Sequence, residues 1–392
     1  MIGQILFYIS LVIALLIGLA YFRDLGDVSQ MLIKVKRENT LRFIRNEYRL
    51  LAIGGAAIAL MVVAYFDFDG GVNWLFWPML VLLAFLYLFP WVWVHVGLRN
   101  QRSTAKYYSL EEARALLAPA ASVVVFENNG VARAHPDSHL MRPHLAGSEE
   151  GLAGENVIMT YCAMANLGLG YIPVIEGDQC ALEVLAQHGN NLILRDNTTN
   201  EPIQQIYGRR DRDAPGGAAM QPWPTFRMSF RSFQKAYPDG TVFLNKPSVN
   251  PLLRLFDLVT ETLFAASIAR QHNEALPIMD NMSNHDDRLP AKTYIWGIDI
   301  GDDAVCFTQD FLVEHGSLIN TEIGGRKVVL AWDPVYKSLG AWYNDSGAPV
   351  TRIDFFGNSD QGSLPRVERL KAGMFWHVWS EFYPGTDINR TV

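Results

Sequence analysis

Residues 157–171 read VIMTYCAMANLGLGY, and the rest of the chain is organised around this stretch. It begins with an apolar, β-branched and aromatic run, which is typical of a buried strand. The run ends at Cys162, and the small residues that follow predict a short turn. The stretch therefore predicts a β-rich body in which one cysteine lies at a strand end, where its sulfur can reach a cleft.

The segments on either side of this stretch also show strand and turn patterns. Asn129-Gly130 is a strong signal for a tight hairpin turn, and DNTTN at residues 196–200 is a second turn. Ser109, followed by acidic residues, predicts the start of a helix. The expected strands are residues 122–126, 131–134, 156–161, 192–195 and 203–207. These patterns predict mostly antiparallel β structure with a few helices.

The second half of this body repeats the layout of the first half. VVVFENNGVA from residue 123 matches YIWGIDIGDDA from residue 294 in pattern, and VIMTYCA from residue 157 matches VVLAWDP from residue 328. Each half closes with an aromatic helix that runs into Tyr-Pro, and Cys162 aligns with Asp333. We expect two related β-rich lobes, at residues 107–258 and 291–392, joined by a helical connector at residues 259–290.

Three apolar runs precede the β-rich part, at residues 2–22, 50–66 and 74–98, and each is long enough to cross a bilayer. The first run has no basic segment before it and no small-residue cleavage site after it, so a retained helix is favoured over a signal peptide. Gly54-Gly55 suits close helix packing. The predicted fold is a three-helix transmembrane anchor, residues 1–98, followed by a β-rich α+β globular part.

Basic residues are concentrated in the loop between the first two runs, whereas the turn between the second and third has Asp67 and Asp69. The positive-inside rule therefore favours the cytoplasmic side for the globular part. A third run that re-enters the membrane at Pro90 would place it on the exported side instead. The basic stretch 28–49 is expected to form an amphipathic helix on anionic lipid, with docking to a partner as the alternative.

Composition and motifs exclude several classes of protein. A formal net charge of −7 argues against a nucleic-acid-binding protein. The three cysteines form no C-x-x-C pair, so neither a disulfide framework nor a structural zinc site is expected. The serine-hydrolase, P-loop and dinucleotide-binding motifs are also absent. The expected partners are the lipid bilayer and other membrane-protein subunits.

Several segments, in order, resemble a family labelled as domain of unknown function 3179. Its T-Y-C-P-x-C-G-T signature is similar to TYCAMANL at residues 160–167, and its V-x-G-x-A-R-A-Y-P hairpin is similar to NGVARAHP at residues 129–136. A later hairpin of the family resembles residues 195–208, and its W-x-x-F-x-P-D-T ending resembles the two Tyr-Pro segments. The resemblance covers most of the part after the apolar runs.

This resemblance has consequences for the chemistry of the turn. Ala165 stands where the family has a second cysteine and Asn166 where it has a glycine, so two-thiol chemistry is absent from this segment. The likeness is to a membrane-anchored, selenoprotein-like branch, which implies a redox or nucleophilic role at the Cys162 position. It also implies a multi-pass protein of the bacterial inner membrane, and exported relatives keep the exported side open for the globular part.

Cys162 is accordingly the candidate catalytic thiol, with Arg133 and His135 as the groups that would lower its pKa. His139 and His144 are candidate metal ligands, because imidazole and sulfur suit copper or zinc, and haem ligation by a histidine is a further option. The alternatives are a buried cysteine that packs as a small apolar side chain, and solvated loop histidines.

Two functional hypotheses result from this sequence. The first is a redox-active or metal-handling membrane protein that uses a single thiol at Cys162, with copper or haem as the candidate cofactors. The second is a non-catalytic accessory or assembly subunit of a larger membrane complex. Whether the protein is an enzyme stays open on the sequence, and no substrate follows from it.

Overall fold

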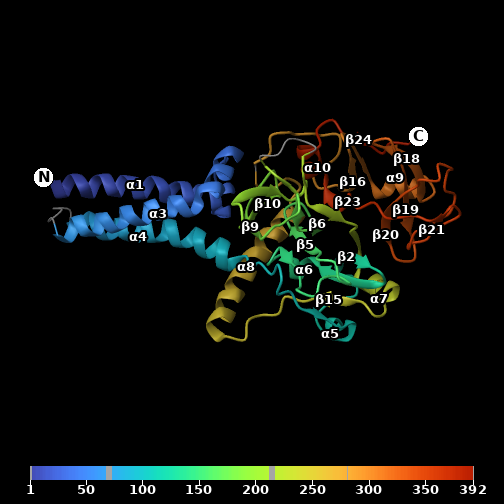
Figure 1. The fold of residues 1–392 in the computed structure, drawn as a ribbon, viewed down its shortest axis with the longest axis horizontal. Coiled ribbons are helices and arrows are strands. Elements are labelled where there is room, and N and C mark those ends of the chain that lie inside the picture. The colour runs from blue at the N-terminus through green and yellow to red at the C-terminus, as the bar shows by residue number, and fades with distance from the viewer. Residues whose placement is uncertain (1, 68–72, 212–216, 280, 392) are drawn as a thin grey trace.

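The computed structural model describes residues 2–67, 73–211, 217–279 and 281–391. A helical bundle projects from one end of a β-rich part, and the N-terminus lies at the far end of the bundle (Figure 1). The bundle comprises α1 (Ile2–Leu25), α2 (Asp27–Gln30), α3 (Arg37–Asp67), α4 (Asn73–Trp91) and the π-helix η1 (Val92–Gly97). Among the described residues, three helices are long and apolar enough to cross a membrane: Ile2–Leu25, Arg37–Asp67 and Trp74–Gly97. The prediction of three long apolar helices followed by a β-rich α+β region is confirmed.

Small residues allow the three long helices to pack closely. A side chain at Gly18 or Gly54 would overlap the ring of Tyr87, whereas Gly55 faces open space. The Tyr87 hydroxyl donates a hydrogen bond to the carbonyl of Ala14 at 2.9 Å. Only the first glycine of the predicted Gly54-Gly55 pair therefore acts as a packing residue.

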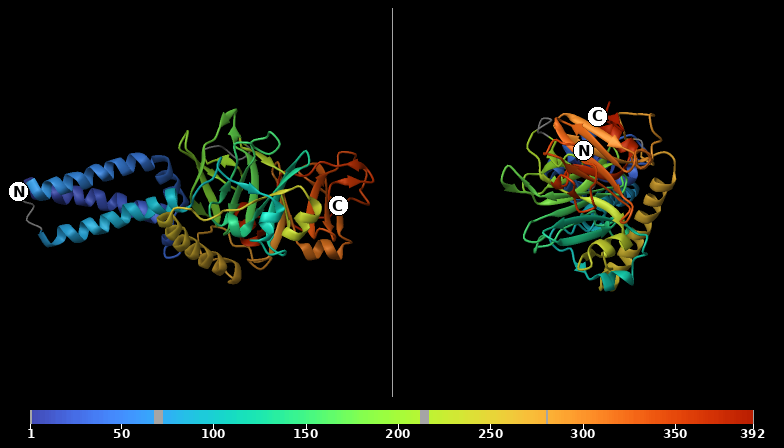
Figure 2. Two further views of the ribbon diagram at one scale, coloured as in Figure 1. Left: turned by 90° about the horizontal axis from the view of Figure 1, so that it is seen from below. Right: turned by 90° about the vertical axis from the view of Figure 1, so that its right-hand side faces the viewer.

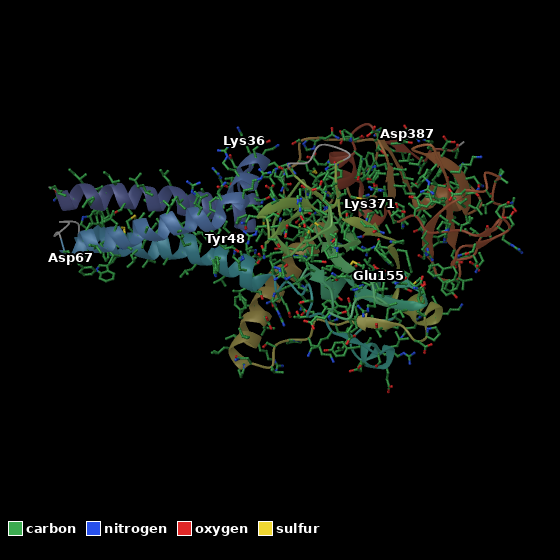
Figure 3. All side chains as sticks on the ribbon, in the orientation of Figure 1. Lys36, Tyr48, Asp67, Glu155, Lys371 and Asp387 are labelled. Atoms are coloured by element: carbon green, nitrogen blue, oxygen red, sulfur yellow. The ribbon has the colours of Figure 1, made fainter. Side chains whose placement is uncertain are left out.

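The expected amphipathic helix over residues 28–49 is wrong in its extent. The chain leaves helical geometry after α2 and resumes it at Arg37, the first residue of α3. Arg37 and Arg45 pair with Asp211 at 2.6 and 2.9 Å, so these cations bind the β-rich part instead of lying free on a lipid surface. Tyr48 marks this junction in Figure 3, and Asp67 lies at the opposite end of the bundle.

A buried ionic network joins the bundle to the β-rich part. Arg195 bridges Glu47 of α3 at 2.5 Å and Glu183 at 3.0 Å. His95 of η1 contacts the same two carboxylates, at 2.9 Å for Glu47 and 3.0 Å for Glu183. Tyr21 of α1 donates to Glu47 at 3.0 Å. Because every charge has an opposite partner, the network fixes three helices on the β-rich part.

Three four- or five-stranded sheets form the first half of the β-rich part. The first sheet has the order β1 (Tyr107–Tyr108), β15 (Thr241–Phe243), β3 (Val131–Pro136), β2 (Ser122–Asn128) and β14 (Phe226–Ser229). The second has the order β13 (Gln221–Trp223), β6 (Leu167–Ile172), β5 (Ile158–Cys162) and β4 (Leu145–Ala146). The third has the order β12 (Arg209–Arg210), β11 (Glu201–Gln204), β10 (Asn191–Asp196) and β9 (Leu182–His188).

Two further sheets form the second half. One has the order β23 (Leu370–Phe375), β16 (Tyr294–Ile300), β17 (Asp303–Phe307) and β24 (Asp387–Ile388), and the other has the order β18 (Leu318–Ile323), β19 (Arg326–Asp333) and β20 (Ser338–Tyr343). The two-stranded pairs are β7 (Val174–Ile175) with β8 (Asp178–Gln179), and β21 (Asn358–Ser359) with β22 (Gly362–Ser363). The remaining helices are α5 (Leu110–Arg114), α6 (Asp137–Leu140), α7 (Phe230–Ala236), α8 (Pro251–Asn273), α9 (Gln309–Glu314) and α10 (Trp376–Phe382).

Strand pairing follows one scheme in both halves. The β2–β3 hairpin is extended by β14, antiparallel to β2, and by β15, parallel to β3. The β16–β17 hairpin is extended by β23, antiparallel to β16, and by β24, parallel to β17. A short helix, α7 or α10, connects the two flanking strands in each case. Helix α8 lies outside these sheets, beside the base of the bundle (Figure 2).

Candidate functional site

Cys162 is the last residue of β5, and its side chain is fully buried. It pairs with Leu167 across the β5–β6 hairpin, and its thiol donates to the carbonyl of Asn190 at 3.4 Å. A cavity of about 50 Å³ lies beside the sulfur, which is room for one metal ion or a few water molecules. The cavity is lined by Leu98, His144, Cys162, Ala163, Met164, Val184, Ala186, Gln187, Leu192, Phe264, Ile268 and Met279.

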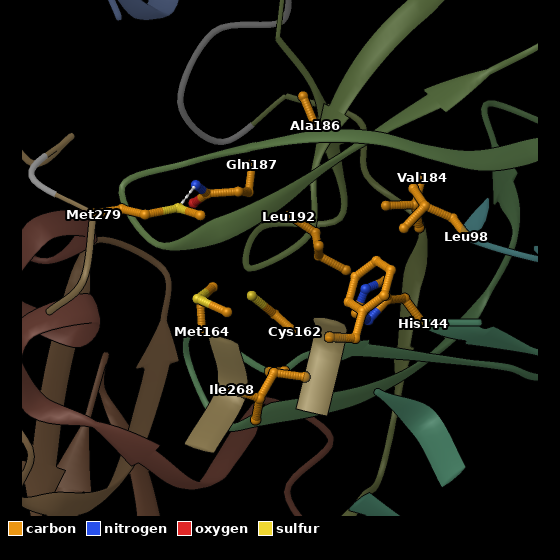
Figure 4. A pocket seen from close by; sticks show the side chains of 12 residues that line it. Leu98, His144, Cys162, Met164, Val184, Ala186, Gln187, Leu192, Ile268 and Met279 are labelled. Carbon is orange, nitrogen blue, oxygen red and sulfur yellow. Dashed lines mark hydrogen bonds between the residues drawn. The ribbon is translucent and has the colours of Figure 1, made fainter. Parts of the chain in front are cut away.

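The polar and sulfur-bearing side chains of this cavity come from separate segments. Cys162 and Met164 belong to the β5–β6 turn, His144 precedes β4, and Met279 follows α8. In Figure 4 the sulfur atoms of Cys162 and Met164 point toward one another, and the His144 ring lies on the other side of Cys162. The Met279 sulfur contacts the side-chain amide of Gln187. Three sulfur-bearing residues and one histidine therefore line the same cavity.

His144 has two features that are uncommon for a structural histidine. Its backbone φ is 63°, in the left-handed region, which costs free energy for a residue with a side chain. Its ring atom Nδ1 is buried without a hydrogen-bond partner among the residues that the structure describes. Burial lowers the pKa of His144 to about 4, and backbone groups of Tyr161 and Leu140 only partly oppose this. The imidazole is therefore neutral near pH 7 and has a lone pair to offer.

Helix α8 closes one side of the cavity. Phe264 and Ile268 of this helix line the space. The helix is held on the β5–β6 turn by two hydrogen bonds, from Gln271 to the carbonyl of Met164 at 2.7 Å and between His272 and the carbonyl of Ala163 at 2.9 Å. Both carbonyls belong to the turn that follows Cys162, so α8 fixes the position of the cysteine and of Met164.

The other predicted site residues lie elsewhere. Arg133 donates to Ser148 at 2.9 Å, and neither it nor His135 lines the cavity beside Cys162. The His135 ring contacts the hydroxyl of Tyr107 at 2.9 Å, and burial lowers the pKa of His135 to about 3. His139 accepts a hydrogen bond from the backbone of Asn245 at 3.1 Å. Of the predicted residues, the structure brings together Cys162 and His144.

Asp333, which aligns with Cys162, ends β19 in the second half. Its carboxylate accepts hydrogen bonds from the backbone of Val335 and Tyr336, both at 2.8 Å, so it stabilises its own turn.

The sequence patterns did not predict Met164 or Met279 as ligands. Met164 lies in the opening stretch, but no local pattern points to Met279, because the fold alone brings it to the cavity.

The composition and size of the cavity limit what it can hold. Among the described residues, no group of three or more histidine, cysteine, aspartate or glutamate side chains could hold a metal ion, so any metal here would need the methionines as well. A cavity of about 50 Å³ is far smaller than the ~300 Å³ or more of a typical cofactor pocket. Haem does not fit this space, whereas a single soft cation does.

These observations define a β-rich protein with three candidate membrane helices and one buried sulfur-lined cavity. Comparison with protein families matches residues 103–386 to the family described as protein of unknown function (DUF3179), so the chain belongs to this family. The match covers the β-rich part and begins after the three long helices. No curated protein and no solved structure matches the chain.

Proposed function

We propose that this membrane protein handles copper and holds one copper(I) ion in the cavity beside Cys162. The observation that carries the proposal is that Cys162, Met164 and Met279 line the same cavity as His144, whose ring atom Nδ1 is buried without a hydrogen-bond partner among the described residues. Thiolate and thioether ligands are soft and select copper(I) over harder divalent ions. Binding would replace the thiol proton of Cys162, and His144 is already neutral near pH 7.

A metal-handling role has more support than thiol–disulfide exchange. Cys162, Cys180 and Cys306 are all buried, and none of these three cysteines forms a disulfide. The position that would supply a resolving thiol in the same turn is Ala165. Because exchange within the chain needs a second thiol next to the first, the turn lacks the partner for that reaction. Arg133 and His135 have no part in the proposal, since neither lines the cavity.

Copper(I) competition tests this proposal with the purified full-length protein in detergent, under reducing and oxygen-free conditions. A colorimetric copper(I) chelator competes with the protein for the ion. We expect one ion per chain, loss of most of the affinity in Cys162→Ser, and roughly tenfold weaker binding in Met279→Leu and His144→Gln. Cys306→Ser is the matched control, because Cys306 is also a buried cysteine outside any disulfide. No bound copper, or equal affinity in Cys162→Ser and the parent protein, would refute the proposal.

An accessory or assembly subunit is the second candidate function. The observation in its favour is that Cys162 is fully enclosed and bonded to Asn190, as a purely structural cysteine would be. This candidate predicts that the protein leaves the membrane in a larger assembly when a mild detergent is used. Native mass measurement giving a single chain in every mild detergent would count against it.

We also infer that the two halves of the β-rich part are related lobes. The correspondence of hairpin, antiparallel neighbour, helix and parallel neighbour supports this inference. The equivalent positions of Cys162 and Asp333, each at the end of its strand, agree with it. Under this inference the copper site belongs to the first lobe alone, because the carboxylate of Asp333 accepts hydrogen bonds from the backbone of its own turn.

A further inference from the structure

Helix α8 presents a row of large apolar side chains to the outside. Leu252 is 79 % exposed, Leu255 is 61 % exposed and Leu258 is 63 % exposed. Val259 and Leu263 continue the row, and each is 52 % exposed. Exposed apolar patches of this kind mark surfaces that are covered by a membrane or by another protein.

The opposite face of α8 is buried, and it is polar in the N-terminal half of the helix, whereas Phe264 and Ile268 line the cavity further along. Asp257 and Thr260 are buried on this face. Asp257 forms ion pairs with Arg142 at 2.7 Å and with Arg99 at 3.0 Å. The helix therefore uses charge to bind the protein and leaves its leucines for a different contact.

The position of α8 indicates what covers the leucines. Phe264 of α8 stacks on Trp93 at a centroid distance of 4.8 Å, and Trp93 belongs to the candidate membrane span Trp74–Gly97. Helix α8 lies beside the end of α4 at the base of the bundle, and its N-terminal end projects away from the bundle in Figure 1. The exposed leucine face is thus continuous with helices that cross the bilayer.

A basic cleft of about 570 Å³ lies next to the N-terminal end of α8. Lys106 and Lys246 line it, together with Arg99, which is paired with Asp257, and Val249, which directly precedes the helix cap. No carboxylate is among the described residues that line the cleft, and the nearest acid to Lys246 is Glu112, at 4.0 Å. Basic pockets beside membrane helices bind the phosphate of anionic lipid headgroups.

We propose that α8 is an additional membrane-contacting element, whose leucine face rests in the interface of the bilayer that the three helices cross. The basic cleft at its N-terminal end contacts anionic phospholipid headgroups. A bilayer is favoured over a second copy of the chain, because the cations of the cleft lie next to the apolar row. Two of them, Arg99 and Lys106, follow the last candidate span closely in sequence, where lipid headgroups would lie. This inference is independent of copper binding.

Site-directed spin labelling of the full-length protein in lipid nanodiscs tests the inference. Labels are placed at Leu255→Cys and Leu258→Cys, and Val313→Cys in α9 is the control, since Val313 is 49 % exposed at the opposite end of the β-rich part (Figure 1). The three native cysteines are buried, and labelled parent protein gives their background. We expect the α8 labels to be accessible to oxygen and shielded from an aqueous nickel complex, and the Val313 label to show the reverse.

A second arm compares phosphatidylcholine discs with discs that also contain phosphatidylglycerol. Anionic lipid should move the Leu255 label deeper, inorganic phosphate should not, and the double variant Lys106→Gln, Lys246→Gln should lose the shift. Labels on α8 as accessible to the nickel complex as the one at Val313 would overturn the proposal. Labels shielded from both reagents in a disc with two chains would overturn it in favour of a second copy. Equal depth in both lipids would overturn the headgroup contact.

Discussion

Two departures from the family signature occur in the turn after Cys162. Asn166 replaces the family glycine and has a backbone φ of 52°, a conformation that asparagine tolerates better than most residues. Its side chain also donates to the carbonyl of Gly373 at 2.7 Å, which ties the turn to the second half of the β-rich part. Ala165 is fully buried, so the lost second thiol has become part of the core. The turn therefore contains one thiol, that of Cys162.

Buried neutral histidines make the stability of the protein depend on pH. Burial lowers the pKa of His144 and of His377 to about 4, from 6.5 in the unfolded chain. Between these values the unfolded chain binds protons that the folded chain does not, so stability is complete above pH 6.5 and falls as the pH drops toward 4. Each such histidine contributes a slope of at most about 1.4 kcal/mol per pH unit.

We therefore expect the unfolding temperature in detergent to fall between pH 7 and pH 4.5, and His144→Gln to make the fall shallower. The exposed His285→Gln is the matched control and should leave the slope unchanged. Thermal unfolding followed by tryptophan fluorescence measures the slope. A slope in His144→Gln equal to that of the parent protein would show that this ring is already protonated in the folded state.

Some elements could be predicted from local sequence, because their signals are local. The hairpin turn at Asn129-Gly130 forms with φ values of 49° and 83°, as the dipeptide predicts. Ser109 caps α5, in a capping box with Glu112. The orientation of α8 could not be predicted, because its exposed leucines follow the same apolar pattern that normally indicates a buried face. Met279 reaches the cavity through contacts with distant segments, and local patterns do not encode such contacts.

The ionic network at the junction between the bundle and the β-rich part should contribute strongly to the free energy of unfolding. Arg195 is fully buried between Glu47 and Glu183. Arg195→Met would leave Glu47 buried without its main partner, and removal of one member of such a pair costs ~3–5 kcal/mol. The double variant Arg195→Met, Glu47→Gln should recover part of this loss, because no unpaired charge remains.

Thermal unfolding of these variants is compared with that of Arg326→Gln, which breaks an exposed pair with Asp345 and should cost about 1 kcal/mol or less. Equal unfolding temperatures for Arg195→Met and Arg326→Gln would contradict a structural role of the network. A double variant less stable than Arg195→Met would show that the pair of Glu47 with His95 stabilises the folded protein without Arg195.

At the scale of the whole molecule, we propose that all three candidate membrane helices cross the bilayer, which would place the N-terminus and the β-rich part on opposite sides. Loop charges favour the cytoplasm for the β-rich part. We expect a C-terminal fluorescent-protein fusion to be bright and a C-terminal alkaline phosphatase fusion to be inactive in a bacterial host. A fusion after residue 70 should show the reverse. An active phosphatase at the C-terminus would place the copper cavity on the exported side.

X-ray absorption at the copper edge of the copper(I)-loaded, full-length protein tests the central claim most directly. The sulfur-lined cavity predicts a first shell dominated by sulfur with one nitrogen contribution, and one fewer sulfur in any copper retained by Cys162→Ser. A first shell of nitrogen and oxygen alone, or a spectrum unchanged in Cys162→Ser, would contradict the account and leave Cys162 as a structural cysteine.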